Sequence, residues 1–204
     1  MSQPEWVARL ERSLGTKSGD HWAAWLQLGV ARLAEERWEE ARQAWQRSFE
    51  RSANPWAARN LARWHMEKQE WAPALDWFAR AYAMAPSDPR LTLEFAECLI
   101  RGGRAAEASD LLQRAPDDAK RRGRHRLLEI WAASEAGQED RFARLVQTPF
   151  DIEDAREGEA SMRQIWIEHH ARRLAREHGE PVSDSWRQAA MRTYPPPTWL
   201  DYSM

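Results

Sequence analysis

Residues 28–49 read LGVARLAEERWEEARQAWQRSF, and residues 61–82 read LARWHMEKQEWAPALDWFARAY. The two stretches start 33 residues apart, and positions that are bulky in one are bulky in the other, while small positions stay small. Self-similarity at such a period is typical of repeat proteins, in which each short unit buries its apolar face against the next. A weaker third copy follows 34 residues later, with the matching residues Phe95, Ala96, Ala108, Leu112 and Ala115.

Each copy predicts a pair of α-helices. Its apolar residues recur at steps of three and four, which is the helical period, and Pro55, Pro86 and Pro89 mark the breaks between copies. Small residues are expected where the two helices of a pair approach closely, with bulky residues filling the space around them. We assign the close contacts to Gly29, Ala41 and Ala74, and the space-filling role to Trp38, Trp45, Trp71 and Phe78.

This pattern resembles the tetratricopeptide repeat family, whose unit has a tryptophan or similar residue, a Leu-Gly pair, a small residue in each helix and a closing proline. The resemblance is clearest over residues 21–86 and extends to residue 115. It implies an all-α fold, a solenoid of antiparallel helix pairs wound into a right-handed superhelix. The residues that carry it are Trp25, Leu28, Gly29, Ala41, Trp45 and Pro55, and then Leu61, Ala62, Ala74, Phe78, Ala81 and Pro86.

The domain organisation follows from the repeats. We expect a single helical repeat domain over residues 1–204, with about eleven helices and no sheet. Helices are predicted in the second half at Asp117–Ala136, Gln138–Thr148, Ala160–His178 and Ser183–Arg192, and a capping helix is predicted at Pro4–Leu14. The expected parts are a cap at 1–20, repeat pairs at 21–54, 55–87 and 88–115, degraded pairs at 116–148 and 159–193, and an extended tail at 194–204.

The chain also resembles the C-terminal tetratricopeptide region of large bacterial multidomain proteins of uncharacterised function. The similar strings are residues 56–62, residues 156–159 and the ending at residues 195–204. This resemblance implies an alternative function, an accessory helical region of a larger, carbohydrate-active enzyme that is not catalytic by itself. A pair of carboxylates in a deep pocket would favour the alternative, and an open groove would favour a binding scaffold.

Composition narrows the classes of partner. The 30 Lys and Arg nearly cancel the 32 Asp and Glu, so no overall field attracts nucleic acid or an anionic membrane. Residues 1–14 lack the pattern of a signal peptide, and no window approaches the roughly 18 apolar residues of a membrane span. The single cysteine, Cys98, is expected in the core and favours a reducing compartment. These features predict a cytoplasmic location without membrane contact.

The candidate partner site lies on the first helix of the second copy. Trp56, Asn60, Arg63 and Glu67 fall at steps of four, three and four on one helix face, with Arg59 beside them. An aromatic ring, an amide and two guanidinium groups suit a peptide backbone or a carboxylate. The alternative is that Trp56 packs on the preceding pair and that both arginines are merely solvated.

Some tetratricopeptide proteins grip a C-terminal carboxylate with lysine and asparagine at two groove positions of the first copy. Leu26 and Val30 occupy those positions here. Because neither side chain can bind a carboxylate, this clamp is absent, which argues against a receptor for chaperone tails.

A concentrated basic run provides the second candidate site. Arg121, Arg122, Arg124 and Arg126 could contact phosphates, which would support weak RNA binding. No aromatic residues for base stacking are interleaved with them, and a solvated helix face, paired with the acidic stretch 151–159, is the preferred interpretation. Nucleic acid is therefore not the expected partner.

The histidines and nucleophiles form no catalytic or metal motif. His169, His170 and His178 lack the i, i+4 spacing that places two metal ligands on one helix face. Neither a nucleophile elbow nor a glycine-rich phosphate loop is present. We expect no enzyme activity, no metal and no cofactor, and the predicted function is protein or peptide binding by the concave face.

The ending of the sequence is unusually apolar. The three prolines at 195–197 must end the last helix, and Trp199 follows them. Because burial of a large side chain is worth about 1.5 to 3 kcal/mol, we expect this tail to dock near Trp166 or Trp186. The alternative is a frayed terminus.

Overall fold

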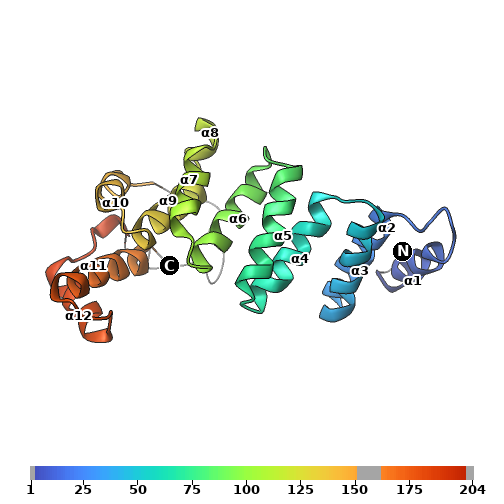
Figure 1. Ribbon diagram of the computed structural model, residues 1–204, viewed down its shortest axis with the longest axis horizontal. Coiled ribbons are helices and arrows are strands. Elements are labelled where there is room, and N and C mark those ends of the chain that lie inside the picture. The colour runs from blue at the N-terminus through green and yellow to red at the C-terminus, as the bar shows by residue number, and fades with distance from the viewer. Residues whose placement is uncertain (1–2, 151–161, 201–204) are drawn as a thin grey trace. The chain divides into compact units, whose positions relative to one another are not determined.

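The structure, a computed structural model, describes residues 3–150 and 162–200. Within these ranges the chain forms α-helices and one 3-10 turn, and no strand (Figure 1). The predicted all-α fold is confirmed. The chain divides into two compact units, Met1–Cys98 and Leu99–Met204. None of the described helices is both long and apolar enough to cross a membrane.

The first unit contains a capping helix followed by helix pairs. The two helices of each complete pair pack along one another, α2 on α3 and α4 on α5. Short links join the two helices, which therefore run antiparallel. The helices are α1 (Gln3–Leu14), α2 (Trp22–Ala34), α3 (Trp38–Arg51), α4 (Pro55–Glu67), α5 (Trp71–Met84) and α6 (Pro89–Arg101), whose last turn belongs to the second unit.

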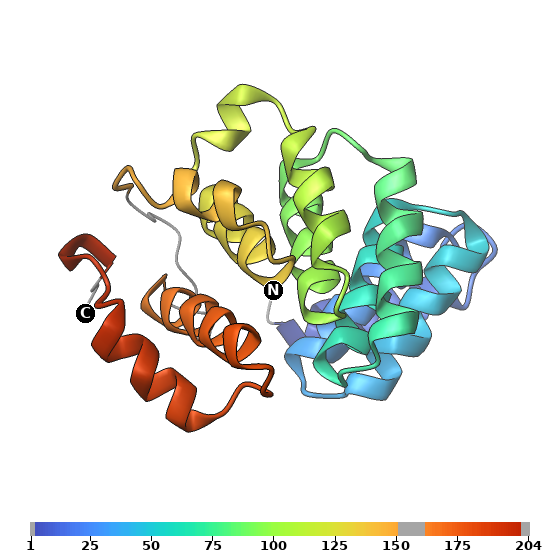
Figure 2. The ribbon, with the colours of Figure 1, turned by 60° about the vertical axis from the view of Figure 1, so that its left-hand side comes forward.

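The second unit continues the pattern with shorter helices. In it α9 packs on α7 and α10, and α11 and α12 lie side by side (Figures 1 and 2). The helices are α7 (Ala105–Gln113), α8 (Asp117–Lys120), α9 (Gly123–Glu135), α10 (Glu139–Leu145), α11 (Met162–His178) and α12 (Asp184–Thr193), and the 3-10 turn η1 (Thr198–Leu200) follows. The helix predicted at 117–136 is thus broken between Lys120 and Gly123.

Helix starts are fixed by side-chain caps at the turn signals seen in the sequence. The Asn54 carboxamide oxygen accepts a hydrogen bond from the Ala57 backbone N–H at 2.9 Å, and Pro55 follows in the first turn. Likewise the Asp88 carboxylate accepts from the Leu91 backbone N–H at 2.9 Å. Each cap satisfies an N–H that the helix leaves unpaired, which stabilises the break between copies.

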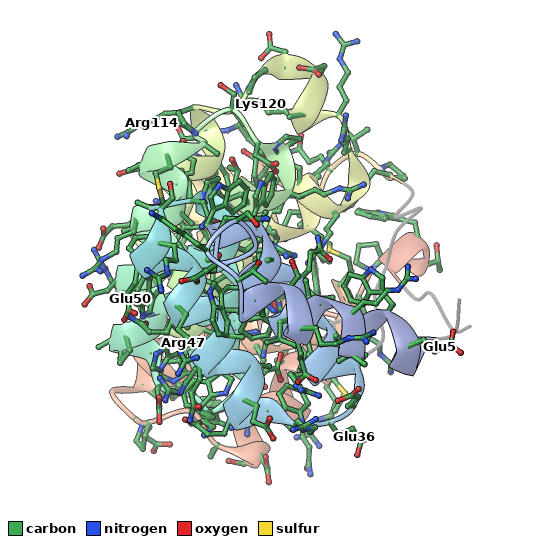
Figure 3. The ribbon with its side chains drawn as sticks, turned by 90° about the vertical axis from the view of Figure 1, so that its right-hand side faces the viewer. Glu5, Glu36, Arg47, Glu50, Arg114 and Lys120 are labelled. Carbon is green, nitrogen blue, oxygen red and sulfur yellow. The ribbon has the colours of Figure 1, made fainter. Side chains whose placement is uncertain are left out.

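A recurring backbone conformation marks the turn inside each pair. Glu36, Gln69, Gly103 and Gly137 all have positive φ, at 60°, 58°, 77° and 66°. They follow one another at 33, 34 and 34 residues, so the repeat register continues into the second unit, where the sequence pattern has faded. The Glu36 side chain points away from the ribbon, as the surface position of such a turn requires (Figure 3).

Close helix approach in the first pair depends on Gly29. A Cβ added at Gly29 would meet the indole ring of Trp45, with Cε2 at 2.9 Å and Nε1 closer still, which is nearer than packed atoms allow. Trp45 is buried, and Ala41 and Ala74 are fully buried as well. The small positions predicted from the sequence are therefore confirmed as packed positions, and Gly29 is held to glycine by the indole ring.

The bulky positions are only partly as predicted. Trp45 and Phe78 are buried, at 3% and 0% exposure. Trp38, which we expected to fill space between helices, is 49% exposed because it begins α3 rather than lying along its packed face. That assignment was wrong.

The predicted capping helix is present as α1. Val7 joins Leu28 and Ala31 of α2 in a buried apolar cluster. Arg32 of α2, only 8% exposed, forms an ion pair with Glu11 of α1 and another, at 2.8 Å, with Glu35. An apolar seam and a shielded guanidinium thus hold the cap on the first pair.

We predict that Gly29→Ala destabilises the protein by about 1 to 3 kcal/mol through overpacking against Trp45. Alanine has the higher helix propensity, by about 1 kcal/mol, so a loss of stability would point to the contact. Urea unfolding followed by circular dichroism measures the effect. Adding Trp45→Phe should restore much of the loss, because the equivalent positions of the second copy are Ala62 and Phe78.

The control is Gly15→Ala, where an added Cβ would meet only the Arg12 carbonyl oxygen at an ordinary 3.4 Å. Equal stabilities of the parent and Gly29→Ala would show that the helices do not approach as closely as described.

Candidate functional site

The residues predicted to bind a partner share one face of α4. Trp56, Asn60, Arg63 and Glu67 recur along it at the helical period, with Arg59 adjacent to Asn60. Trp56 is 44% exposed and therefore does not pack into the preceding pair. We call these five residues the α4 face. Its open part consists of an indole, an amide and an exposed ion pair.

Arg59 is not available to a ligand in the way the sequence suggested. Its Nε and Nη2 both donate to the carboxylate of Glu94 on α6, each at 2.5 Å, and the Glu94 side chain is only 2% exposed. This carboxylate raises the pKa of Arg59. The forked pair satisfies a buried charge, so Arg59 supports the fold by tying α4 to α6.

Sequence reasoning missed Glu94. It lies 34 residues after Asn60, at the equivalent position of the third copy. Extending the repeat register by one unit would have placed Glu94 beside the α4 face. The register would not have predicted that Arg59 is its partner. Pairing with Arg59 is a feature of the three-dimensional packing.

Arg63 and Glu67 remain adaptable. Arg63 Nη2 lies 3.0 Å from Glu67 Oε1, one helical turn on, and both side chains are partly exposed. Exposed pairs of this kind are worth only about 0.3–0.5 kcal/mol, so a ligand can exchange for either partner at little cost. Asn60 accepts a long hydrogen bond from Arg59, at 3.4 Å, through its oxygen, which leaves its amide N–H groups for a ligand.

The basic run does not form the solvated helix face that we expected. Arg124 is buried at 4% exposure, and Nη2 of Arg126 donates to the backbone oxygens of Leu145 and Thr148 at 2.9 and 3.0 Å. Arg121 and Arg122 alone are exposed, at the break between α8 and α9. The acidic stretch 151–159 lies outside the described residues. An exposed stripe of four arginines for RNA is therefore not present.

Two adjacent histidines of α11 lie in the second unit and face α10 and the tail. His169 stacks on Phe142 at 3.6 Å between ring centroids, and its Nε2 lies 2.9 Å from the Glu139 carboxylate. His170 stacks on Tyr194 at 4.3 Å. Burial lowers the pKa of both, that of His170 to about 4. Among the described residues, no cluster of three or more His, Cys, Asp or Glu side chains could hold a metal ion.

The tail packs against this region. The indole N–H of Trp166 donates to the Tyr194 backbone oxygen at 2.9 Å, and Trp199 packs on the apolar cluster that includes Phe142. Residues 198–200 form a 3-10 turn, so this part of the tail predicted at 194–204 is not extended. Residues 201–204, part of the same predicted tail, lie outside the described residues.

Cys98 is buried at 0% exposure, as expected of a core residue. Burial raises the pKa of its thiol to about 12, so the thiol is protonated near neutral pH. Paired helices with a recurring turn define a helical repeat protein.

Comparisons with known proteins agree with this class. Residues 69–129 match the family profile of the tetratricopeptide repeat. Among solved structures, YrrB, described as a TPR protein with an unusual peptide-binding site, matches 94% of this chain and 95% of its own, with a TM-score of 0.62 and 12% identity. A tetratricopeptide repeat protein from Parabacteroides merdae matches 97% of this chain and 76% of its own, with a TM-score of 0.62 and 14% identity. PilF of Pseudomonas aeruginosa matches 92% of this chain and 76% of its own, with a TM-score of 0.53 and 17% identity.

No curated protein matches the chain in sequence. The matched segment and the fold nevertheless agree with one another. The family match covers residues 69–129, and the fold of the chain is that of tetratricopeptide repeat proteins, as the sequence pattern predicted.

We predict that Arg59→Ala destabilises the protein by about 3 kcal/mol, because it leaves the Glu94 carboxylate buried without its partner. Arg63→Ala, the control on the same face, should change stability by less than about 0.5 kcal/mol. Urea unfolding measures both. The double variant Arg59→Met with Glu94→Met should recover most of the loss, and equal losses for Arg59→Ala and Arg63→Ala would contradict the assigned roles.

Two buried histidines predict a pH dependence of stability. Burial lowers the pKa of His125 and His170 from 6.5 to about 4. Each group is neutral in the folded state, so its contribution is complete above pH 6.5 and is lost as the pH falls toward 4. We expect a loss of about 2 kcal/mol for each by pH 5.

The unfolding free energy at pH 7.5 and pH 5 tests this expectation. His170→Phe keeps a ring between Trp166 and Tyr194 but cannot titrate, so it should lose less stability than the parent over this interval. The same pH slope in parent and His170→Phe would refute the prediction.

Proposed function

We propose that this protein is a binding scaffold that holds an extended peptide segment of a partner protein on the α4 face. The observation that carries the proposal is the uncovered indole of Trp56, 44% exposed, on the same helix face as the amide of Asn60 and the exchangeable Arg63–Glu67 pair. An aromatic anchor beside amide and charged groups suits a peptide side chain and its backbone.

The comparisons support the coarser part of this proposal. The tetratricopeptide fold is one of protein-interaction scaffolds, and YrrB is described as having a peptide-binding site of its own. We propose that this chain also binds a peptide. Within the α4 face, we assign Arg59 a structural role. Catalysis forms no part of the proposed function, and the cytoplasmic location stays a prediction.

Neither alternative function gains support. RNA binding through the basic run requires exposed arginines, but Arg124 is buried and Arg126 is bound to backbone oxygens. An accessory role in a carbohydrate-active enzyme rested on a resemblance that none of the similar proteins supports. The α4 face therefore remains the preferred site.

We predict that peptides selected from a random phage library on the immobilised protein lose at least tenfold in affinity on Trp56→Ala and on Asn60→Ala. Loss of an aromatic anchor commonly costs about 2 kcal/mol or more, which corresponds to a factor of roughly 30. Isothermal titration calorimetry with the selected peptides measures it.

The matched control is Trp38→Ala. Trp38 is as exposed as Trp56 but begins α3, off the α4 face. If the selected peptides lose affinity equally on Trp38→Ala, or keep it on Trp56→Ala, the α4 face is not the site. A failure to select any peptide would count against peptide binding itself.

A further inference from the structure

A second candidate site, separate from the α4 face, is a cleft of about 540 Å³ in the second unit. Its apolar walls are Phe142 of α10, Trp166 of α11, and Pro197 and Trp199 of the tail. These elements are side by side because the tail turns back after α12 and packs Trp199 on the cluster around Phe142. The cleft is a consequence of tail docking.

The charged groups around this cleft differ in whether they are already paired. Glu139 faces His169 at 2.9 Å and forms an ion pair with Arg176. Arg173 is paired with Glu177 at 3.0 Å. Asp140 also lines the cleft, is exposed, and pairs with none of the residues that the structure describes. One carboxylate that lines the cleft thus has no ion-pair partner within residues 3–150 and 162–200.

The indole rings that line the cleft also lack a charged partner among the described residues. Some tryptophans of this chain lie beneath cations: Arg47 lies 4.7 Å from the ring of Trp25, and Arg80 lies 4.8 Å from that of Trp77. Over Trp166 and Trp199, by contrast, no Arg or Lys from residues 3–150 or 162–200 is found. Both rings are half-buried and border the cleft that contains Asp140.

One buried polar side chain in the wall of the cleft lacks a hydrogen-bond partner within the described part of the chain. His170 lines the cleft, is 8% exposed, and neither of its ring nitrogens has a hydrogen-bond partner among the described groups. Buried polar atoms are nearly always satisfied, and an unsatisfied one costs about 1–3 kcal/mol. Both ring nitrogens are also shut off from solvent beside the rings of Trp166 and Tyr194, so His170 forms part of the aromatic wall and is not a hydrogen-bonding group of the cleft.

We propose that this cleft binds a guanidinium group carried on an apolar stem. A planar guanidinium forms a forked ion pair with a carboxylate such as Asp140 and stacks on indole rings such as those of Trp166 and Trp199. The apolar stem would lie along Phe142 and Pro197. An ammonium group lacks the planar fork and the stacking face, so it fits less well.

The same chemistry could come from two sources, an arginine side chain of a peptide or a free alkylguanidine. Two probes represent them, n-butylguanidinium and the tripeptide acetyl-Gly-Arg-Gly-amide. Each has a neutral partner of nearly the same shape, n-butylurea and the citrulline tripeptide. Comparing the two affinities within each pair separates the contribution of the positive charge from that of the apolar stem.

Isothermal titration calorimetry of the full chain with these four probes tests the proposal. We expect at least one guanidinium probe to bind at least tenfold more tightly than its neutral partner. Asp140→Asn, which keeps the shape, should weaken that binding at least fivefold. Asp110→Asn, at another exposed carboxylate of the second unit, should leave it unchanged. Trp199→Leu, checked for folding by circular dichroism, should also weaken binding.

The comparison of the two guanidinium probes identifies the source. Tighter binding of the arginine tripeptide indicates a protein ligand, and equal or tighter binding of n-butylguanidinium indicates a free small molecule. The proposal is overturned if no guanidinium probe binds, if both bind no better than their neutral partners, or if Asp140→Asn and Asp110→Asn behave alike.

Discussion

The close approach of two helices at Gly29 is the constraint on which the first repeat depends. The Trp45 ring occupies the space that a Cβ at Gly29 would need. In the second copy the equivalent positions are Ala62 and Phe78, a larger small residue with a smaller ring, and both are fully buried. Volume is exchanged within a pair while the helix spacing is kept, which is what close packing at fixed geometry requires.

The backbone conformation of the turns follows the repeat period even where the side-chain pattern of the repeat has faded. Positive φ recurs at Glu36, Gln69, Gly103 and Gly137, so the turn between helices keeps its geometry through four successive pairs. Non-glycine residues at such angles are strained by an amount on the order of 1 kcal/mol, and the flanking helices must impose them. Packing of the pairs therefore dictates the turn, which explains why the turn outlasts the aromatic pattern that first indicated the family.

The periodicity of the sequence was sufficient for the fold class, the pairs and the packed small positions, because these depend on local spacing and side-chain volume. It was not sufficient for charged residues. Arg59 pairs with Glu94 and Arg126 with backbone oxygens near the end of α10, and both partners are distant in sequence. The α4 face was identified by helical spacing alone. The apolar ending predicted that the tail docks near Trp166 or Trp186, but it did not predict the cleft, which depends on how Trp199 packs against Phe142 of a different helix.

Thirteen tryptophans in one chain must be either buried or shielded, and this chain does both. Trp45 is in the core, and Trp25 and Trp77 lie beneath arginines whose stems cover the rings. Trp56, Trp166 and Trp199 have no such cover among the described residues, and they lie beside polar groups able to orient a ligand. Trp38 is also uncovered, but it lies off the α4 face and does not line the cleft. Exposure alone therefore does not define a site, since directional groups beside the ring are what confer specificity for one partner over another.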